Sequence, residues 1–351
     1  MKPFDYIRPA TVAEAVAAAA QPGAAYLAAG TNLLDLMKGG VSRPDRLVDV
    51  MHLKGLDRIE PLPDGALRIG ALVRNADLAH DADFAKSYPA VAEALLSGAS
   101  AQLRNAATVA GNLLQRTRCA YFYDTASRCN KREPGSGCDA RDGENRTHAV
   151  LGWSESCIAT HPSDFCVPLL ALDAVVEIEG RNGRREIALD DLHRLPGDTP
   201  QRDSALEPGD LIVAVRLPPA ARGFAAHARY LKVRERTSYA FAVVSAVAAL
   251  QIENGKITEA RLALGGVAAK PWRARVAEDV LKGAAPDAAA FQEAARRALT
   301  DAKPSGDNAF KIELARRIVV RALTLAAVGT PARMPALPAS PFASTSGVLH
   351  A

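Results

Sequence analysis

The sequence predicts an α+β fold in several compact units, and three observations lead to that prediction. Strand-like and helix-like segments are mixed through most of the chain, and three helical stretches follow each other from about residue 272 to residue 329. The 351 residues are 48% hydrophobic and 23% charged, which is enough apolar material for two or three cores. We therefore expect an ordinary folded protein with more than one sheet.

Residues 1–55 alternate helix and strand signals. Thr11 to Glu14 has the form of a helix capping box, and Pro22 and Gly23 end that helix. A short strand (AAYLAAG), a helix with glycines at its end (NLLDLMKGG) and another strand (RLVDV) follow. Units of this kind place the turns after their strands at one edge, where ligands bind.

Two further parts follow. Residues 56–222 contain the strand-like runs ALRIGAL, AVVEIEG, RREIAL and LIVAVRLP, and are interrupted at about 116–160 by a segment with almost no hydrophobic period. Residues 223–330 contain the strand-like runs HARYLKVRE, FAVVSAVAALQI and ITEARLALGG, with a hairpin turn at Asn254 and Gly255, before the three helices. The tail, residues 331–351, is rich in Pro, Ser and Ala, so we expect it to be flexible or to lie over a partner.

Charge and hydropathy exclude several classes of partner. The net charge is only +4 and no block of five like charges occurs, so we expect no nucleic-acid binding. No apolar stretch is long enough to span a bilayer, so we expect no membrane insertion. The first residues lack the pattern of an export signal. Assembly in the cytoplasm is therefore expected, and a partner with its own signal would be needed for export.

Two turns of small residues indicate a ligand with phosphate groups. In YLAAGTNLLDLM, residues 26–37, a strand leads through Ala and Gly into a helix, whose first N–H groups can bind an anion. One such turn is more often an ordinary helix cap. A second turn, residues 108–112 in QLRNAATVAGN, has the same character. Two such turns favour a ligand with two phosphates.

The pair AAGTNLLDLMK and QLRNAATVAGN resembles the two signatures of the FAD-binding subunit of the xanthine dehydrogenase and molybdenum hydroxylase family, although Ala29 and Ala110 stand where glycine is common. The resemblance covers about residues 2–330. It implies a two-part FAD-binding domain of the PCMH and CO dehydrogenase flavoprotein type, then a C-terminal α+β domain. The implied FAD contacts in the two turns are Tyr26, Leu27, Ala28, Ala29, Gly30, Thr31, Asn32, Leu33, Leu34, Thr108, Gly111 and Asn112.

Two later segments extend the resemblance. HPSDFCVPLLALDA is similar to the family's Pro-Ser-Asp segment, which implies that Asp164 contacts the flavin or its ribityl chain. YLKVRERTSYAFAVVS is similar to the strand whose lysine lies beside the isoalloxazine, which implies that role for Lys232. The residues alone also allow a helix cap at Asp164 and a solvated lysine at position 232.

All five cysteines lie within residues 119–166. Their odd number and the size of the chain make a disulfide framework the minority interpretation. The first four are spaced C-x9-C-x8-C-x18-C, which is too open for a zinc knuckle and lacks the close run of bacterial ferredoxins. Spacing alone therefore leaves the bound species open. We expect the fifth, Cys166, to be a buried and inert thiol.

The cysteine segment resembles the flavoprotein subunit of bacterial periplasmic-type aldehyde oxidoreductases, which binds a 4Fe-4S cluster as well as FAD. The cluster ligands that this resemblance implies are Cys119, Cys129, Cys138 and Cys157. His148 and His161 are alternative ligands by residue type, but the four cysteines already complete the set. The implied role is an electron-transfer subunit of a heterotrimer. Its large subunit carries a molybdenum cofactor and converts an aldehyde and water to a carboxylic acid, and its small subunit carries 2Fe-2S clusters.

In such a complex, FAD in this chain passes electrons to an external acceptor, and no catalytic side chain is expected here. We favour a structural role for the 4Fe-4S cluster. Three alternatives remain: the equivalent subunit of a xanthine or other hydroxylase, a stand-alone flavin oxidase, and a non-enzymatic zinc scaffold. The oxidase is disfavoured because no histidine precedes His52 and no cysteine precedes Cys119, so the first turn lacks a residue that could tether FAD covalently.

Overall fold

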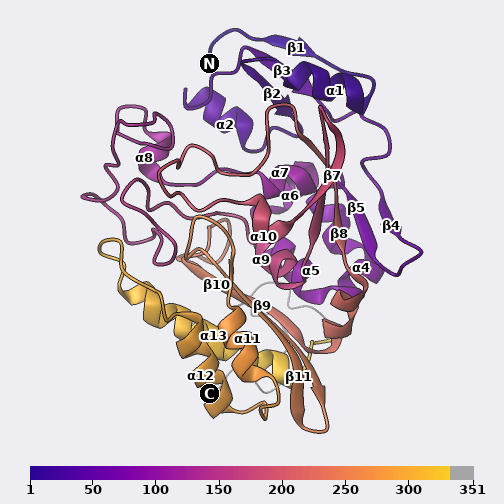
Figure 1. Cartoon of the computed structure of the whole chain (residues 1–351), viewed down its shortest axis with the longest axis vertical. Helices are drawn as coiled ribbons and strands as arrows, with labels where there is room; N and C mark the ends of the chain where they lie inside the picture. The colour runs from indigo at the N-terminus through magenta and orange to yellow at the C-terminus, as the bar shows by residue number, and fades with distance from the viewer. Residues whose placement is uncertain (333–351) are drawn as a thin grey trace.

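The computed structural model describes residues 1–332, and these form three β-sheets with helices between and around them (Figure 1). A three-stranded parallel sheet has the order β1-β3-β2 and a five-stranded antiparallel sheet has the order β4-β5-β8-β6-β7. A four-stranded antiparallel sheet has the order β12-β11-β10-β9. The predicted α+β fold is confirmed. Most of the predicted tail, residues 333–351, lies outside the described residues.

The N-terminal sheet carries the first small-residue turn. Its elements are β1 (Asp5–Ile7), α1 (Val12–Ala19), β2 (Ala24–Leu27), α2 (Leu33–Lys38) and β3 (Arg46–Asp49). Thr11 Oγ1 accepts a hydrogen bond from the Glu14 amide at 3.2 Å, and the Glu14 carboxylate accepts one from the Ala10 amide at 2.8 Å. The predicted capping box is therefore present, with the glutamate reaching one residue further back than usual.

The five-stranded sheet and seven helices form the middle of the molecule. The strands are β4 (Ile59–Pro61), β5 (Leu67–Gly70), β6 (Val175–Gly180), β7 (Gly183–Ala188) and β8 (Leu211–Leu217). The helices are α3 (Asn75–His80), α4 (Ala82–Ser87), α5 (Pro89–Ser97), α6 (Ala101–Ala106), α7 (Val109–Leu113), α9 (Cys166–Ala171) and α10 (Leu189–Leu192). Strand β8 and helices α5 and α9 are almost entirely buried because they lie at the centre of the largest core.

The third sheet contains the predicted hairpin. The elements are the 3₁₀ helix η1 (Pro219–His227), β9 (Ala228–Val233), β10 (Val244–Glu253), β11 (Lys256–Gly265), β12 (Trp272–Arg273), α11 (Arg275–Leu281), α12 (Ala288–Ala298) and α13 (Phe310–Val328). Asn254 and Gly255 join β10 to β11 with φ of +50° and +73°, as a two-residue turn of this type requires. No helix in residues 1–332 has the length and apolar character needed to cross a bilayer.

Strand β10 joins two hydrophobic cores because its side chains alternate between the two faces of the sheet. Val247 and Ala249 belong to the middle core, which also contains α5 and α9. Ala246, Ala248 and Leu250 belong to the C-terminal core, with α11, α12 and α13. Helices therefore cover both faces of this sheet, and the C-terminal part packs firmly against the middle of the molecule.

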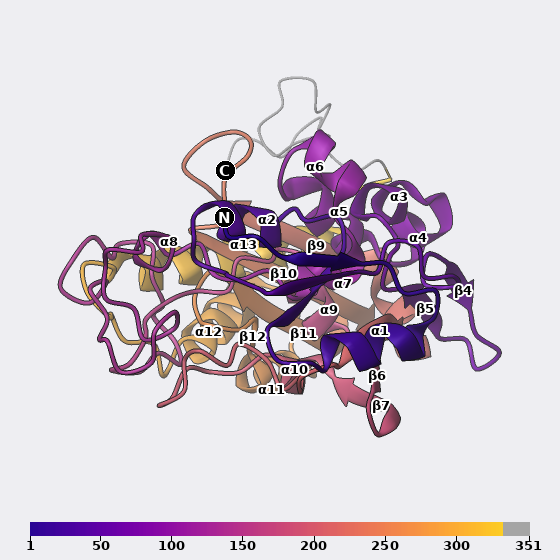
Figure 2. The same cartoon turned by 90° about the horizontal axis from the view of Figure 1, so that it is seen from above.

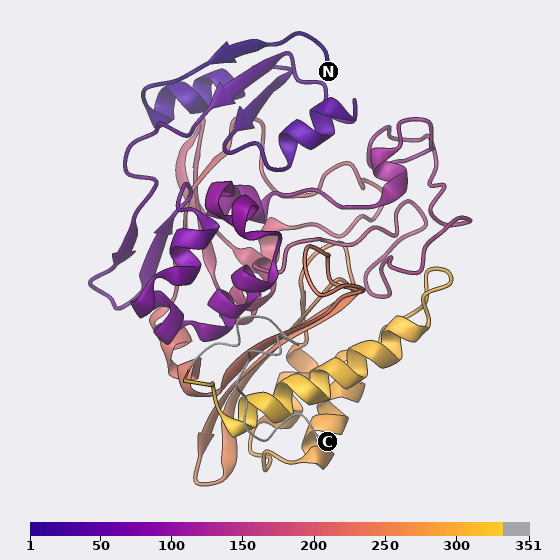
Figure 3. The same ribbon diagram turned by 180° about the vertical axis from the view of Figure 1, so that it is seen from behind.

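The segment at residues 116–160 projects to one side of the molecule and contains a single short helix, α8 (Ala120–Tyr123) (Figure 2). The segment that has almost no hydrophobic period in the sequence thus has little regular structure. One end of helix α13, yellow in Figure 3, lies next to it. There the fully buried Lys311 donates hydrogen bonds of 2.7 Å to the carbonyl oxygens of Thr147, His148 and Gly266. One side chain thus holds the segment to both α13 and the third sheet.

Replacing Lys311 with methionine removes the donor to three buried carbonyl groups. We expect Lys311→Met to lower the free energy of unfolding by about 3 kcal/mol, since each unsatisfied buried polar group costs about 1–3 kcal/mol. Thermal unfolding of the purified chain measures this, with a fall in Tm of about 5 °C. Lys256→Met, at an exposed lysine, is the control and leaves Tm unchanged. Equal Tm values for the two variants would contradict the role of Lys311.

Candidate functional site

The turn between β2 and α2 presents free backbone amides. Gly30 has φ of +73°, and a Cβ atom there would lie 2.6 Å from a methyl group of Leu34. Leu27 and Leu34 pack behind this glycine. The amides of Gly30, Thr31 and Asn32 have no hydrogen-bond partner within residues 1–332. This turn is therefore free to bind an anion, as its sequence predicted.

The second turn is built differently. Thr108 is the N-cap of α7, and its Oγ1 accepts a hydrogen bond of 3.2 Å from the Gly111 amide. The Asn112 amide donates to the Thr108 carbonyl, and the amides of Val109 and Ala110 donate to carbonyls of the segment that follows β5. These amides already have hydrogen-bond acceptors within the protein, so they are not free to bind a ligand. The second turn contributes a small-residue surface, whereas the first contributes free donors.

Both turns line one cavity of about 250 Å³. Of the predicted contact residues, the wall contains Tyr26, Ala28, Ala29, Gly30, Thr31, Asn32, Leu33, Thr108 and Gly111. The cavity adjoins a larger one of about 870 Å³, since Thr31, Asn32 and Gly111 line both. Asn112, Asp164 and the buried Asn75 also line the larger cavity, and Asn75 Oδ1 has no partner in the described part of the chain. Together these adjoining cavities have room for an extended ligand, and the free amides of Thr31 and Asn32 lie in the wall that they share.

Asp164 and Lys232 are brought together at the larger cavity. Asp164 Oδ2 accepts a hydrogen bond of 2.7 Å from Lys232 Nζ, and Oδ1 accepts one of 2.6 Å from the hydroxyl of Tyr230. Burial and the Asp164 charge raise the pKa of Tyr230 well above its usual value, so this phenol stays a donor. Asp164 lines the cavity, but Lys232, with 1% of its side chain exposed, lies behind it and also contacts the Ser97 carbonyl.

Asp203 links the first turn to the cysteine segment. Its carboxylate accepts hydrogen bonds from Arg116 Nε, at 2.6 Å, and from the buried Lys131. The backbone amide of Arg116 donates to the side-chain oxygen of Asn32 at 2.8 Å. Burial acts to raise the pKa of Asp203, but the charges of Arg116 and Lys131 hold it below its usual value. Asp203 therefore remains an anion between two cations.

The four cysteines predicted as ligands converge on one small cavity, and none forms a disulfide. Cys129 and Cys138 face each other in an antiparallel bridge, and Ser136 Oγ accepts a hydrogen bond of 3.0 Å from the Cys129 amide. Burial raises the pKa of the Cys119 thiol to about 12, and it also raises the pKa of Cys138 and Cys157. Nearby cysteine charges add to these shifts. A bound cation would offset both effects.

The sulfur atoms are too far apart to surround a single zinc ion without movement. Zinc–sulfur bonds of about 2.3 Å at tetrahedral angles place sulfur atoms about 3.8 Å apart. Within residues 1–332, His161, Cys166 and His193 are the only such group whose ligand atoms all lie within 4.8 Å of one another. The cavity that the four cysteines line has a volume of about 10 Å³, so little free space lies between their side chains.

Two family models match the chain. The FAD binding domain in molybdopterin dehydrogenase matches residues 2–220, and the CO dehydrogenase flavoprotein C-terminal domain matches residues 229–326. The chain belongs to the FAD-binding subunits of the molybdopterin dehydrogenases. This family membership makes it an oxidoreductase flavoprotein, and confirms the resemblance seen in the two turns.

Relatives and solved structures agree with this family. The chain is 52% identical over 325 residues to the aldehyde oxidoreductase FAD-binding subunit of Escherichia coli (strain K12), covering 92% of this chain and 98% of that one. It is 27% identical to the carbon monoxide dehydrogenase medium chain of Afipia carboxidovorans, with 87% and 88% covered. A solved carbon monoxide dehydrogenase from Hydrogenophaga pseudoflava superimposes with a TM-score of 0.73 at 26% identity, with 93% and 99% covered.

The flavoprotein site differs from the sequence prediction in a few places. Leu27 and Leu34 support the first turn from behind, and Lys232 supports Asp164, so these three do not line the cavities. His148 lies beside the cysteines, with Nε2 3.2 Å from Cys119 Sγ, whereas His161 lies outside their cavity. The roles of Asn75 and Asp203 were missed because an isolated Asn or Asp in a helix or loop carries no motif.

Gly30 offers a direct test of FAD binding in this flavoprotein. An added methyl group is strained at positive φ and contacts Leu34, so the turn and its free amides shift. We expect Gly30→Ala to weaken FAD binding about tenfold, or about 1.4 kcal/mol, as measured by flavin content after gel filtration and by FAD titration of the apoprotein. Gly40→Ala is the matched control, because Gly40 has φ of +74° but lies outside both cavities. Equal FAD loss in both variants would show only a general effect of strain.

Proposed function

We propose that this chain is the FAD- and 4Fe-4S-containing electron-transfer subunit of a molybdenum-dependent aldehyde oxidoreductase. In the proposed complex a large subunit with the molybdenum cofactor converts an aldehyde and water to a carboxylic acid. A small subunit with 2Fe-2S clusters connects it to this chain, from which electrons reach an external acceptor. The observation that carries the proposal is the convergence of four cysteines on one cavity in a chain 52% identical to an aldehyde oxidoreductase FAD-binding subunit.

The residues of this chain bind and position FAD, which supplies electron-transfer chemistry when bound. The free amides of Gly30, Thr31 and Asn32 would bind the diphosphate, and the small residues at Thr108 and Gly111 leave space for it. Asp164 would accept hydrogen bonds from the flavin or its ribityl chain. Its carboxylate is held in one orientation by Tyr230 and Lys232, so it can act as a preorganised acceptor. No proton transfer by a side chain of this chain is required.

The cluster would be held by the thiolates of Cys119, Cys129, Cys138 and Cys157. Lys131 lines their cavity and its charge lowers the pKa of Cys157, opposing the effect of burial. Cys119 lines both this cavity and the larger FAD cavity, so the cluster site and the flavin site share a wall. We propose that the cluster mainly keeps this wall in shape, because residues 116–160 contain little regular structure.

Other features of the proposal concern domains, compartment and alternatives. We propose domains at 1–55, 56–222 and 223–330, and the change between family models at residues 220–229 supports the last boundary.

We propose assembly in the cytoplasm, with export only by a partner that carries an export signal. The second candidate function is the equivalent subunit of a xanthine dehydrogenase. It is favoured because the chain is 27% identical to a protein of Escherichia coli whose name describes a xanthine dehydrogenase FAD-binding subunit.

Substrate oxidation by the assembled complex tests the function. The chain is coexpressed with a tag and with the large and small subunits from its own source, and the purified complex is assayed with aldehydes and with xanthine. We expect copurification of three chains and reduction of an artificial electron acceptor with aldehydes but not with xanthine. Activity with xanthine alone would favour the second candidate. Aldehyde oxidation by the purified chain without partners would overturn the subunit proposal in favour of a flavin oxidase.

The cluster proposal predicts iron loss on mutation of one ligand. Protein purified without oxygen should contain about four iron and four sulfide atoms per chain. We expect Cys129→Ser to lose at least half of that iron, because one cluster bond is removed, and to unfold at lower temperature. Cys166→Ser is the matched control, since Cys166 is buried outside this cavity, and should keep its iron. Unchanged iron in Cys129→Ser would remove Cys129 from the ligand set.

A further inference from the structure

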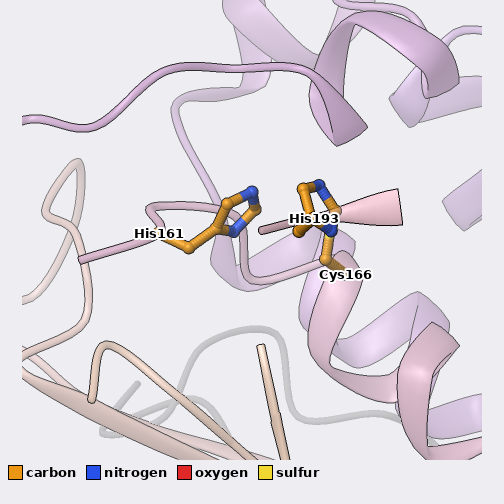
Figure 4. A group of neighbouring side chains, drawn as sticks. All are labelled: His161, Cys166 and His193. Carbon is orange, nitrogen blue, oxygen red and sulfur yellow. The ribbon is translucent and has the colours of Figure 1, made fainter. Parts of the chain in front are cut away.

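A second group of potential metal ligands lies outside the cysteine cavity. His161 comes from the loop before α9, Cys166 from the first residue of α9 and His193 from the end of α10 (Figure 4). One ligand atom from each residue lies within 4.8 Å of the other two. The two imidazole rings meet at an interplanar angle of 62°, with centroids 4.4 Å apart. Two nitrogen ligands and one sulfur ligand are a combination that zinc binds well.

The hydrogen bonds of His193 leave one ring nitrogen ready to bind a cation. His193 is 6% exposed, and its Nε2 lies 2.8 Å from the carbonyl oxygen of Leu113, which can only accept. Nε2 must therefore carry the proton, and Nδ1 has a lone pair. This Nδ1 is buried and has no partner within the described residues. Metal-bound histidines commonly have this arrangement, with the second nitrogen donating to a carbonyl group.

His161 and Cys166 add the other two ligands. Nε2 of His161 is also buried without a partner in residues 1–332, while its Nδ1 lies 3.3 Å from the Ser163 amide. Ligation through Nε2 moves the proton to Nδ1, so this long hydrogen bond is lost and two N–H donors face each other there. Cys166 is fully buried, and its backbone amide is held by Ser163 Oγ at 3.2 Å. The alternative is a metal-free pair in which His161 Nε2–H points at His193 Nδ1, and the experiment must separate the two.

The two histidines lie beside a further cavity. His161 and His193 line a cavity of about 410 Å³ that adjoins the flavin and cysteine cavities, since Thr117 lines all three. Arg116 and Lys131 are in its wall, and both are bonded to Asp203, which offsets one of their two positive charges. His161 Nε2 and His193 Nδ1 are buried and Cys166 does not line this cavity, so the ion would lie beneath its wall. From these observations we propose that His161, Cys166 and His193 bind one zinc ion, a site separate from the proposed iron–sulfur cluster.

Zinc at this position would stabilise one wall of the flavin cavity. Ser163, which lies between His161 and Asp164, donates a hydrogen bond of 2.7 Å from Oγ to the side-chain oxygen of Asn112. Asn112 and Asp164 both line the larger cavity. An ion joining the loop before α9 to α9 itself and to α10 would therefore restrict the movement of this wall. The expected signature is thermal stabilisation of the full chain by zinc.

Metal analysis of the full-length protein tests the proposal. Protein with its FAD and iron is dialysed against a chelator, supplied with one equivalent of Zn²⁺ and passed through gel filtration. We expect about one zinc per chain, a raised Tm, and a zinc X-ray absorption spectrum with one sulfur and two imidazole ligands. Cys166→Ser and His193→Ala should each weaken zinc binding at least tenfold and keep iron and flavin unchanged.

Two comparisons make the outcome decisive. Cys138→Ser should lose iron and keep zinc, which separates this site from the cysteine cavity. His161→Asn, at a partly exposed residue on the cavity wall, replaces Cys166→Ser or His193→Ala if either fails to fold. The proposal is overturned if wild-type protein holds no more zinc than the His193→Ala or His161→Asn variant. It is also overturned if zinc is lost in Cys138→Ser but retained in Cys166→Ser, because the ion would then be in the cysteine cavity.

Discussion

The irregular segment at residues 116–160 is the constraint on which both sites depend, because so long a connection with one short helix cannot hold its own shape. Its position is set by side chains at separate points. The Arg116 amide is bonded to Asn32 at one end, and near the other end the Asn145 side-chain oxygen accepts a hydrogen bond of 2.6 Å from the Asp307 amide. A metal cluster at the four cysteines would add the cross-links that secondary structure does not provide.

This arrangement couples the flavin cavity to the cysteine cavity. Cys119 lines both, and Asn32 contributes to the flavin cavity while its side chain fixes the start of the segment. A movement of the segment would therefore alter the first turn and the larger cavity together. The proposed electron transfer would need the flavin in one fixed position, so a rigid segment would also serve the flavin.

Local sequence predicted the elements well, because strands, caps and turns depend on neighbouring residues. The capping box at Thr11 and the hairpin at Asn254 were both found where expected. Contacts between residues that are far apart in the chain could not be predicted from local sequence. Asp164 and Lys232 were each expected beside the flavin, but the sequence could not show that one supports the other. The proximity of His161 to His193 depends on how α9 and α10 pack, and no spacing rule encodes that distance.

Three buried lysines lie where the parts of the molecule meet. Two are paired with a carboxylate, whereas Lys311 is bonded only to carbonyl groups and burial lowers its pKa to about 7. Lys232 joins β9 to Asp164 before α9, Lys131 joins the cysteine segment to Asp203, and Lys311 joins α13 to three carbonyl groups. Buried ion pairs add little net stability, because desolvation offsets their attraction, but an unpaired buried charge costs several kcal/mol. Misplacing any of these parts would leave a lysine without its partner. The buried lysines therefore favour one arrangement of sheets and segment, and with it the relative position of the two cavities.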